Sequence, residues 1–259
     1  MPNSTHILVI RLSALGDVAM TVPVIRGLVQ TYPNLRLTVV SRRGYQPLFE
    51  GIPNVDFLEA DVYGKHKGLF GLMKLAKEAR ALHIHAVADL HNVIRSKILT
   101  RNLGFKGKRT ATIDKGRAEK KKLTNAAGMG LEKLKTTHQR YVDVFASLGF
   151  PIALDRVTLP ERRPLTPRLL TLIGREPKKC IGIAPFAAYE SKMYPLDRTK
   201  ELIQMLAEEG QHQILLFGGG PEEEALLKQW ESQFERVTNV AGVLTFDEEL
   251  NLISNLDLM

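Results

Sequence analysis

A carboxylate stands at a position where it could take part in acid–base chemistry. Asp17 comes after an apolar run, residues 6–12, and a turn that contains Ser13 and Gly16, at the start of a helical pattern. A carboxylate held between a strand and a helix can accept the proton of an attacking hydroxyl. It can equally cap the helix by accepting a backbone N–H. From spacing alone, both interpretations of Asp17 stay open.

The end of another predicted strand, residues 85–90, carries further polar side chains. His91 follows directly, and Arg95 and Ser96 come a few residues later. Arginine binds carboxylates through two parallel hydrogen bonds, so Arg95 together with His91 could hold an acidic or hydroxyl-rich ligand. The alternative for His91 is a histidine that is satisfied within the fold at the end of its strand.

In the second half of the chain, two loops could approach a phosphorylated ligand. Ala187 and Ala188 precede Lys192, whose ammonium could neutralise a departing diphosphate or could simply lie on the surface. Gly218 and Gly219 begin a glycine run between a strand and a helix, which suits the approach of a nucleotide. Glu222 and the two glutamates after it repel phosphate. They favour ribose hydroxyls, or they only offset the helix dipole.

Several common site motifs are missing from the sequence. The first loop is not GxGxxG, and neither GxxxxGK[ST] nor GxSxG occurs, which counts against dinucleotide, P-loop and hydrolase interpretations. No HExxH or Asp-x-Asp pair is present, so we expect no metal. The one cysteine, Cys180, excludes an internal disulfide and is expected to be a buried strand residue.

These residues are set among short apolar runs that alternate with amphipathic spacing. In the first half the strands are expected over residues 6–12, 36–41, 54–60, 85–90 and 109–113, and the helices over 18–30, 68–82, 93–103 and 137–148. Such alternation predicts the α/β class, with a doubly wound parallel sheet whose ligand edge lies at the carboxyl ends of the strands.

Proline residues divide the chain. They punctuate residues 160–178, which we interpret as a linker with a short embedded helix between domains at 1–159 and 179–259. Strands are then expected over 180–184, 213–217 and 236–239, and helices over 195–209, 221–233 and 247–254. Because another strand opens near residue 255, where the sequence stops, we expect the second domain to be incomplete in this chain.

Positive charge is concentrated in one region. The formal net charge is +8, and residues 95–140 hold fourteen Lys and Arg against three acidic residues. A field of this kind attracts polyanions or an anionic membrane surface, unless it is only a solvated face. Phe105 is the one aromatic residue within it, which argues against nucleic acid. No signal peptide or spanning segment is evident, so a cytoplasmic or membrane-peripheral location is expected.

Taken together, the motifs resemble glycosyltransferase family 9, the heptosyltransferases of the lipopolysaccharide core. The opening ILVIRLSALGDVAMTVPVIRGL has the family's Ser-x-x-Gly-Asp loop, and DLHNVIRS is similar to its D-x-Q-x-x-x-[KR]-S segment, with His91 in place of Gln. SKMYP resembles the family's K-x-W-P with Tyr194 in place of Trp, and GGGPEEE and NVAGVLTFDEELNLISNLDLM follow the same pattern. In the family, a phosphate-binding D-[ST]-G-x-x-H segment follows the strand that opens here at Leu256.

The resemblance implies a GT-B fold of two Rossmann-like domains, the first for the acceptor and the second for the nucleotide sugar. It implies an inverting transferase without cofactor or metal, with Asp17 as catalytic base, ADP-heptose as donor and Kdo-lipid A of the inner core as acceptor at the inner membrane leaflet. Donor contacts are then assigned to Lys192, Ala187, Ala188, Gly218, Gly219, Glu222 and Leu244. Acceptor contacts are assigned to Ser13, Gly16, His91, Arg95, Ser96, Arg117 and Lys120.

Two alternatives remain at this point. One is a GT-B enzyme that uses a UDP- or GDP-sugar, and the other is a non-catalytic protein that binds nucleotides or polyanions. We expect a monomer that binds no nucleic acid.

Overall fold

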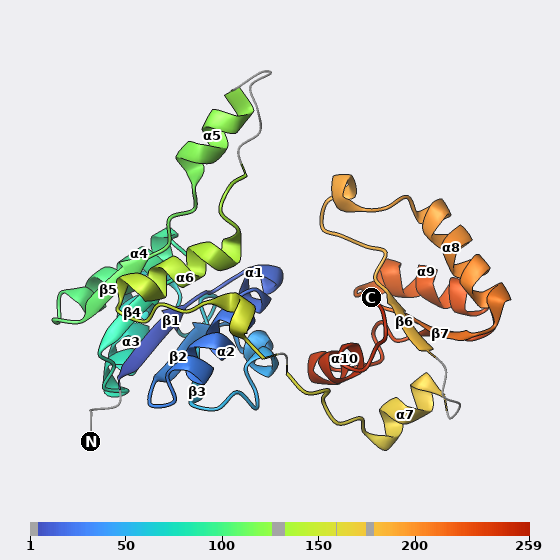
Figure 1. Cartoon of the computed structure of the whole chain (residues 1–259), viewed down its shortest axis with the longest axis horizontal. Coiled ribbons are helices and arrows are strands. Elements are labelled where there is room, and N and C mark those ends of the chain that lie inside the picture. The colour runs from blue at the N-terminus through green and yellow to red at the C-terminus, as the bar shows by residue number, and fades with distance from the viewer. Residues whose placement is uncertain (1–4, 126–132, 159, 175–178) are drawn as a thin grey trace. The chain divides into compact units, whose positions relative to one another are not determined.

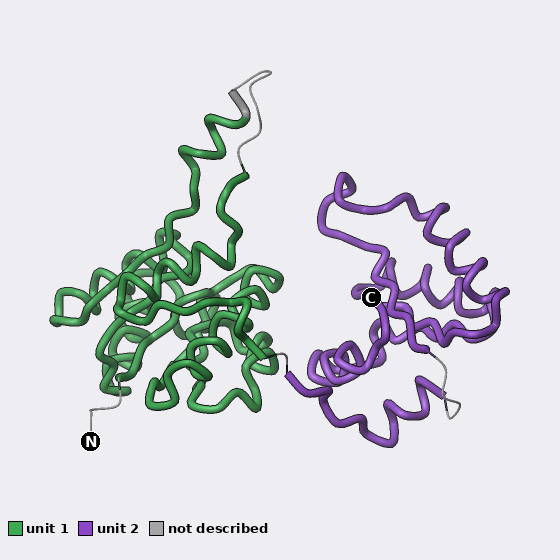
Figure 2. Tube along the Cα trace, in the orientation of Figure 1, with its two compact units in different colours: residues 1–159 green, residues 160–259 purple. Residues whose placement is uncertain are grey.

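The computed structural model describes residues 5–125, 133–158, 160–174 and 179–259. The chain divides into two compact units, unit 1 over residues 1–159 and unit 2 over residues 160–259 (Figures 1 and 2). Each unit is built on a parallel sheet, as the alternation of strands and helices predicts. In the described parts of the chain, no helix is long and apolar enough to cross a bilayer.

The five-stranded sheet of unit 1 has the order β3-β2-β1-β4-β5, and all neighbouring strands are parallel. Its strands are β1 (His6–Ile10), β2 (Arg36–Ser41), β3 (Val55–Glu59), β4 (Ala86–Asp89) and β5 (Arg109–Thr112). The order reverses between β1 and β4. In sheets of this kind, ligands bind at that point, beyond the carboxyl ends of the strands.

The core of unit 1 lies on both faces of the sheet. Every residue of β1 is buried, and successive side chains alternate between the faces. Ile7 and Val9 pack with side chains of α2 (Val22–Thr31) and α6 (Thr137–Ser147). Leu8 and Ile10 pack with those of α3 (Gly68–Ala81) and α4 (Ile94–Gly104). Helices therefore cover both faces, and the doubly wound arrangement is confirmed.

The first predicted helix, residues 18–30, is two helices in the structure. α1 spans Leu15–Ala19, and α2 begins at Val22 after a break. Pro23 sits in the first turn of α2, where its missing N–H costs nothing, but its ring cannot follow a continuous helix. The hydroxyl of Thr21 donates to the carbonyl of Val18 at 2.7 Å and closes the break. Asp17 therefore belongs to a short helix of its own.

Three described elements of unit 1 have no counterpart in the sequence prediction. They are the 3₁₀ helices η1 (Arg43–Leu48) and η2 (Leu154–Arg156), and α5 (Arg117–Asn125). In Figure 1, α5 stands away from the sheet. Its sequence, RAEKKKLTN, carries almost no apolar side chains. A helix without an apolar face gives no periodic signal in the sequence.

Unit 2 contains the three-stranded parallel sheet β6-β7-β8. Its elements are α7 (Pro167–Ile173), β6 (Lys179–Ile183), η3 (Glu190–Lys192), α8 (Leu196–Glu209), β7 (His212–Leu216), α9 (Pro221–Glu231), β8 (Val237–Asn239) and α10 (Phe246–Ile253). Leu258 forms a parallel bridge with Ile181, so the segment expected as a further strand lies beside β6. Gly182 permits this approach, since a Cβ there would come within 2.5 Å of Leu256. Cys180 is buried, as expected.

The predicted linker is part of unit 2 as far as the structure describes it. Leu169 of α7 is fully buried, and Leu172 packs against the small core around Phe217. Arg163 pairs with Asp247 at 3.1 Å. Proline therefore marks an irregular segment that still packs against its own unit, and residues 175–178 lie outside the described residues.

Candidate active site

Asp17 lies just beyond the carboxyl end of β1, next to the point where the strand order reverses. It does not cap its helix, because Ala14 is the N-cap residue and no side chain caps α1. The carboxylate instead pairs with Arg11, which also donates to the backbone carbonyl of Leu90 at 2.8 Å. Arg11 thus joins the loops after β1 and β4. The side chain of Asp17 is 42% exposed, so its carboxylate is accessible to a ligand.

A pocket of about 220 Å³ opens at this carboxylate. It is lined by Arg11, Asp17, Ile113, Lys115, Lys120, Thr137, Arg140 and Tyr141. Burial, followed by the charges of Arg11 and Arg117, lowers the pKa of Lys115. Burial raises the pKa of Tyr141, whose hydroxyl donates to the backbone carbonyl of Asp17 at 3.2 Å. One acid among several cations suits an anionic ligand that presents a hydroxyl.

His91, on the loop after β4, is buried beside this pocket. Its Nδ1 accepts the backbone N–H of Leu12 at 3.3 Å, so the proton of the neutral ring is on Nε2. Burial, then the charges of Arg11 and Lys115, lowers the pKa of His91 to about 4. Asp17 opposes this shift, and Arg42 adds to it. The ring is therefore a neutral hydrogen-bond donor at physiological pH.

The lowered pKa of His91 makes stability depend on pH. The imidazole titrates near 4 in the folded chain and near its ordinary 6.5 when unfolded, so the unfolded chain takes up the proton first as pH falls. The contribution is complete above about pH 6.5 and is lost progressively toward pH 4. On going from pH 7.5 to 4.5, we expect His91→Gln to lose about 2 kcal/mol less unfolding free energy than the wild type. Denaturant titrations at both pH values measure this, and identical losses would refute it.

Ser96, predicted as an acceptor contact, has a different place. It is fully buried, and its hydroxyl accepts the backbone N–H of Val93 at 3.0 Å and donates to the carboxylate of Asp89 at 3.0 Å. Asp89 also accepts the backbone N–H groups of His91 and Asn92, both at 2.9 Å. These bonds fix the loop that carries His91. The prediction that Ser96 contacts the acceptor is therefore wrong. The buried serine instead holds the loop after β4 in place.

Arg95 and Arg117 line a second, more open pocket at the same edge of the sheet. Its other lining residues are Asn92, Val93, Ile94 and Lys97, and its volume is about 610 Å³. The guanidinium of Arg95 lies 5.9 Å from the ring centre of Tyr63, and that of Arg42 lies 5.1 Å from it. Stacking of this kind orders two cations beside one another. The structure thus brings Arg95 and Arg117 together and places Lys120 with Asp17. Of the two predicted contacts that follow β1, Ser13 in the loop is half-buried, and Gly16 in α1 is exposed.

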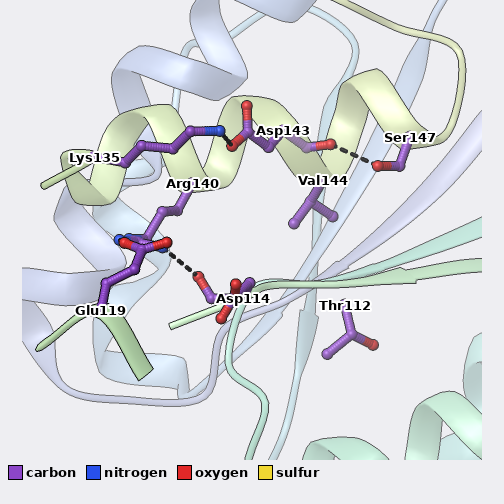
Figure 3. A pocket seen from close by; sticks show the side chains of 8 residues that line it. All are labelled: Thr112, Asp114, Glu119, Lys135, Arg140, Asp143, Val144 and Ser147. Carbon is purple, nitrogen blue, oxygen red and sulfur yellow. Dashed lines mark hydrogen bonds and ion pairs between the residues drawn. The ribbon is translucent and has the colours of Figure 1, made fainter. Parts of the chain in front are cut away.

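Arg140 joins the first pocket to a third one, shown in Figure 3. This third pocket, of about 190 Å³, is lined by Thr112, Asp114, Glu119, Lys135, Arg140, Asp143, Val144 and Ser147. The buried guanidinium of Arg140 pairs with Glu119 of α5 at 2.6 Å and donates to the carbonyl of Asp114 at 3.3 Å. Gly116 leaves room for it, because a Cβ there would lie 2.2 Å from Arg140. Arg140 therefore fixes the base of α5, which bears Lys120.

In unit 2, Lys192 ends η3 and is exposed. Its ammonium lies 5.3 Å from the ring centre of Tyr189. Ala187 and Ala188 precede it on the same loop beyond the carboxyl end of β6, and both are exposed. This loop presents a cation and small side chains to the solvent, as a phosphate-binding loop requires.

The backbone N–H groups of the glycine loop after β7 already bond to side chains of the helix that follows, α9. The backbone N–H of Gly219 donates to Glu223 at 2.9 Å, and that of Gly220 donates to Glu224 at 3.1 Å. These carboxylates take the donors that would otherwise bind a phosphate. The exposed Glu222 is left at the surface. Leu244, predicted as a donor contact, is half-buried and packs against the core around Phe217.

The family model for glycosyltransferase family 9 (heptosyltransferase) matches residues 72–259. The chain belongs to this family. A curated relative, the lipopolysaccharide core heptosyltransferase OpsX of Haemophilus influenzae, is 29% identical over 100 residues. That match covers 39% of this chain and 27% of the relative.

Solved structures of the family share the fold of this chain. The family 9 glycosyl transferase from Veillonella parvula has a TM-score of 0.74 at 20% identity, over 100% of this chain and 76% of that one. E. coli heptosyltransferase WaaC with ADP-2-deoxy-2-fluoro heptose has a TM-score of 0.68 at 19% identity, over 98% of this chain and 82% of that one. The expected GT-B architecture of two Rossmann-like units is therefore confirmed.

Sequence reasoning missed four residues that shape the pocket of this family 9 chain. Arg11, Lys115, Arg140 and Tyr141 all line it with Asp17. Arg11 lies inside an otherwise apolar run, residues 6–12. A cation in such a run is an available signal, since it needs a partner once it is buried. Among the described residues, no three His, Cys, Asp or Glu side chains gather as metal ligands would.

Proposed function

We propose that this chain is an inverting glycosyltransferase that transfers a heptose from ADP-heptose to a Kdo or heptose acceptor of the lipopolysaccharide inner core. The observation that carries the proposal is the accessible carboxylate of Asp17 in a cationic pocket at the reversal point of the sheet. Membership of the heptosyltransferase family supports the donor and the acceptor class.

In the proposed reaction, Asp17 accepts the proton of an acceptor hydroxyl. The oxygen attacks the anomeric carbon of the donor from the face opposite the diphosphate. The new glycosidic bond forms as the bond to ADP breaks, with inversion at that carbon. Arg11 holds the carboxylate, and the cations Lys115, Lys120 and Arg95 attract the carboxylates and phosphates of the acceptor.

Donor chemistry is assigned to unit 2. Lys192 stabilises the charge that develops on the departing diphosphate, and Ala187 and Ala188 let it approach the backbone. Gly218, Gly219 and Glu222 face the nucleoside, where a carboxylate suits ribose hydroxyls better than phosphate. We propose that the enzyme works without metal as a monomer, on the cytoplasmic face of the inner membrane, with no nucleic-acid partner.

The donor is tested by competition. ADP is expected to inhibit transfer from ADP-heptose to a Kdo acceptor more strongly than UDP or GDP does, because the nucleoside is recognised as well as the diphosphate. Product formation is followed by mass spectrometry. Stronger competition by UDP or GDP would point to another nucleotide sugar. Binding of ADP without any product would favour a non-catalytic protein.

Lys192 supplies a second test. Lys192→Ala is expected to lower kcat about 100-fold, because a charge aimed at the developing diphosphate acts in the transition state. Lys192→Arg should recover part of the rate. Lys228→Ala, which removes another exposed lysine of unit 2, is the matched control and should transfer at the wild-type rate. Equal rates for Lys192→Ala and Lys228→Ala would remove Lys192 from the reaction.

A further inference from the structure

Exposed apolar side chains gather at one edge of unit 1. In a parallel sheet, the segments that leave the carboxyl ends of the strands all lie at the same edge. Here the loop from β3 to α3 carries Tyr63, the first turn of α3 carries Leu69 and Phe70, and α4 begins at Ile94. Their exposed fractions are 65%, 59%, 91% and 78%. Exposed apolar groups that cluster in this way mark interaction surfaces.

Side-chain contacts show that these segments are neighbours. Arg95, beside Ile94, stacks on the ring of Tyr63 at 5.9 Å. Further along the two helices, Asn102 of α4 donates to the sulfur of Met73 of α3 at 3.3 Å. α3 and α4 therefore lie side by side, with their first turns at the same edge of the sheet.

The same edge is strongly basic. The segments after the strands, together with α5, carry Arg42, Arg43, Lys65, Lys67, Arg95, Lys97, Arg117, Lys120, Lys121 and Lys122. Carboxylates on these segments are engaged within the chain. Asp61 accepts the backbone N–H groups of Gly64 and Lys65, and Glu119 pairs with Arg140. Lys65 pairs with Glu78 at 3.9 Å. The apolar side chains thus share this edge of the sheet with an excess of basic residues, two of which, Arg42 and Arg95, stack on Tyr63.

We propose that this edge is a docking surface for a bilayer that contains anionic lipids. Cations bind the headgroup phosphates, and Leu69 and Phe70 enter the layer below them. The docking surface would bring a lipid-linked acceptor to Asp17, and in this respect the inference rests on the proposed function. A soluble anion would engage the cations alone. Apolar side chains between cations match a surface that has hydrocarbon beneath negative charge.

Vesicle sedimentation tests this without any transfer reaction. The wild-type chain is expected to bind vesicles of phosphatidylcholine with phosphatidylglycerol, and to bind pure phosphatidylcholine weakly. Leu69→Ser with Phe70→Ser should lower the partition coefficient roughly tenfold, because two apolar side chains no longer leave water. The matched control is Phe105→Ser, since Phe105 is 79% exposed but lies between α4 and β5, at the opposite edge.

Charge is tested in the same way. Lys121→Glu with Lys122→Glu should lower binding to the anionic vesicles about tenfold or more. Lys106→Glu, at the edge that carries Phe105, should leave binding unchanged. Circular dichroism melts compare the folding of all variants.

Three results would overturn the proposal. They are absence of wild-type binding to anionic vesicles, unchanged binding by the Leu69→Ser, Phe70→Ser chain, and loss of a dimer in that chain by sedimentation equilibrium in place of lost vesicle binding. The last would make the patch a contact between two copies. Transfer to a soluble deacylated acceptor tests the proposed function separately. A chain that binds vesicles but transfers nothing would refute that function and leave the docking surface standing.

Discussion

Asp17→Asn is expected to lower kcat for heptose transfer by about 10³-fold, within the range that a general base contributes. Asparagine keeps an oxygen that can accept the hydrogen bond of Arg11, so the loop and the pocket should persist. It cannot accept a proton from the acceptor hydroxyl. We therefore expect KM for both substrates and the melting temperature to change little. The measurement is steady-state transfer with a soluble Kdo acceptor, followed by mass spectrometry.

The control for Asp17→Asn separates chemistry from local structure. Arg11→Met removes the partner of the carboxylate and leaves the carboxylate itself, and it should destabilise the loops after β1 and β4 because the bond to Leu90 is also lost. Asp17→Asn should instead leave the fold stable and slow the transfer reaction. If the asparagine variant is well folded and transfers at the wild-type rate, Asp17 is not the base and the proposed mechanism fails.

The strands and the face-to-face layering of unit 1 follow from local patterns in the sequence. Residues 36–41, RLTVVS, read as a strand because they are rich in β-branched residues, and β2 has those bounds. In β1, Ile7 and Val9 pack into one core, and Leu8 and Ile10 pack into the other. An apolar strand of this kind therefore predicts a sheet that is covered on both faces. The fold was therefore predictable wherever apolar spacing was strong.

α5 could not be predicted, for the opposite reason. Its residues bury no apolar stripe, and its base is held by an ion pair between Glu119 and Arg140, which are 21 residues apart in sequence. Pairings of this kind depend on tertiary structure and leave no periodic trace. Pro23 is visible in the sequence, but the sequence does not show that α1 ends before it and that a second helix, α2, begins at Val22.

In the candidate site, too, some residues could be predicted from local sequence and others only from the tertiary structure. Asp17 and His91 were found because both follow strand ends, and topology then places strand ends at one edge. Ser96 was misassigned because a motif position does not reveal whether a side chain faces solvent or its own loop. Arg11 was missed because only the fold shows that its guanidinium reaches Asp17 and Leu90 together.

Asp89 is expected to be the polar residue whose loss most affects stability of unit 1. Its carboxylate is fully buried and accepts two backbone N–H groups and the Ser96 hydroxyl. Asp89→Ala removes the acceptor of all three hydrogen bonds and leaves the two backbone N–H groups without this partner, while the Ser96 hydroxyl keeps the carbonyl of Val93. Each such donor costs about 1–3 kcal/mol, so we expect the free energy of unfolding to fall by about 4 kcal/mol. Denaturant titration at pH 7.5 measures it.

Asp89→Asn is the matched variant, since its remaining oxygen can still accept both backbone N–H groups. It should lose about 1–2 kcal/mol, because only the bond to Ser96 changes character. Transfer should follow the same order, with Asp89→Ala slower than Asp89→Asn, because the loop carries His91 and its backbone carbonyl at Leu90 anchors Arg11. Equal stability of the alanine and asparagine variants would mean that the loop holds its shape without the carboxylate. The position of Asp17 would then not depend on Asp89 at all.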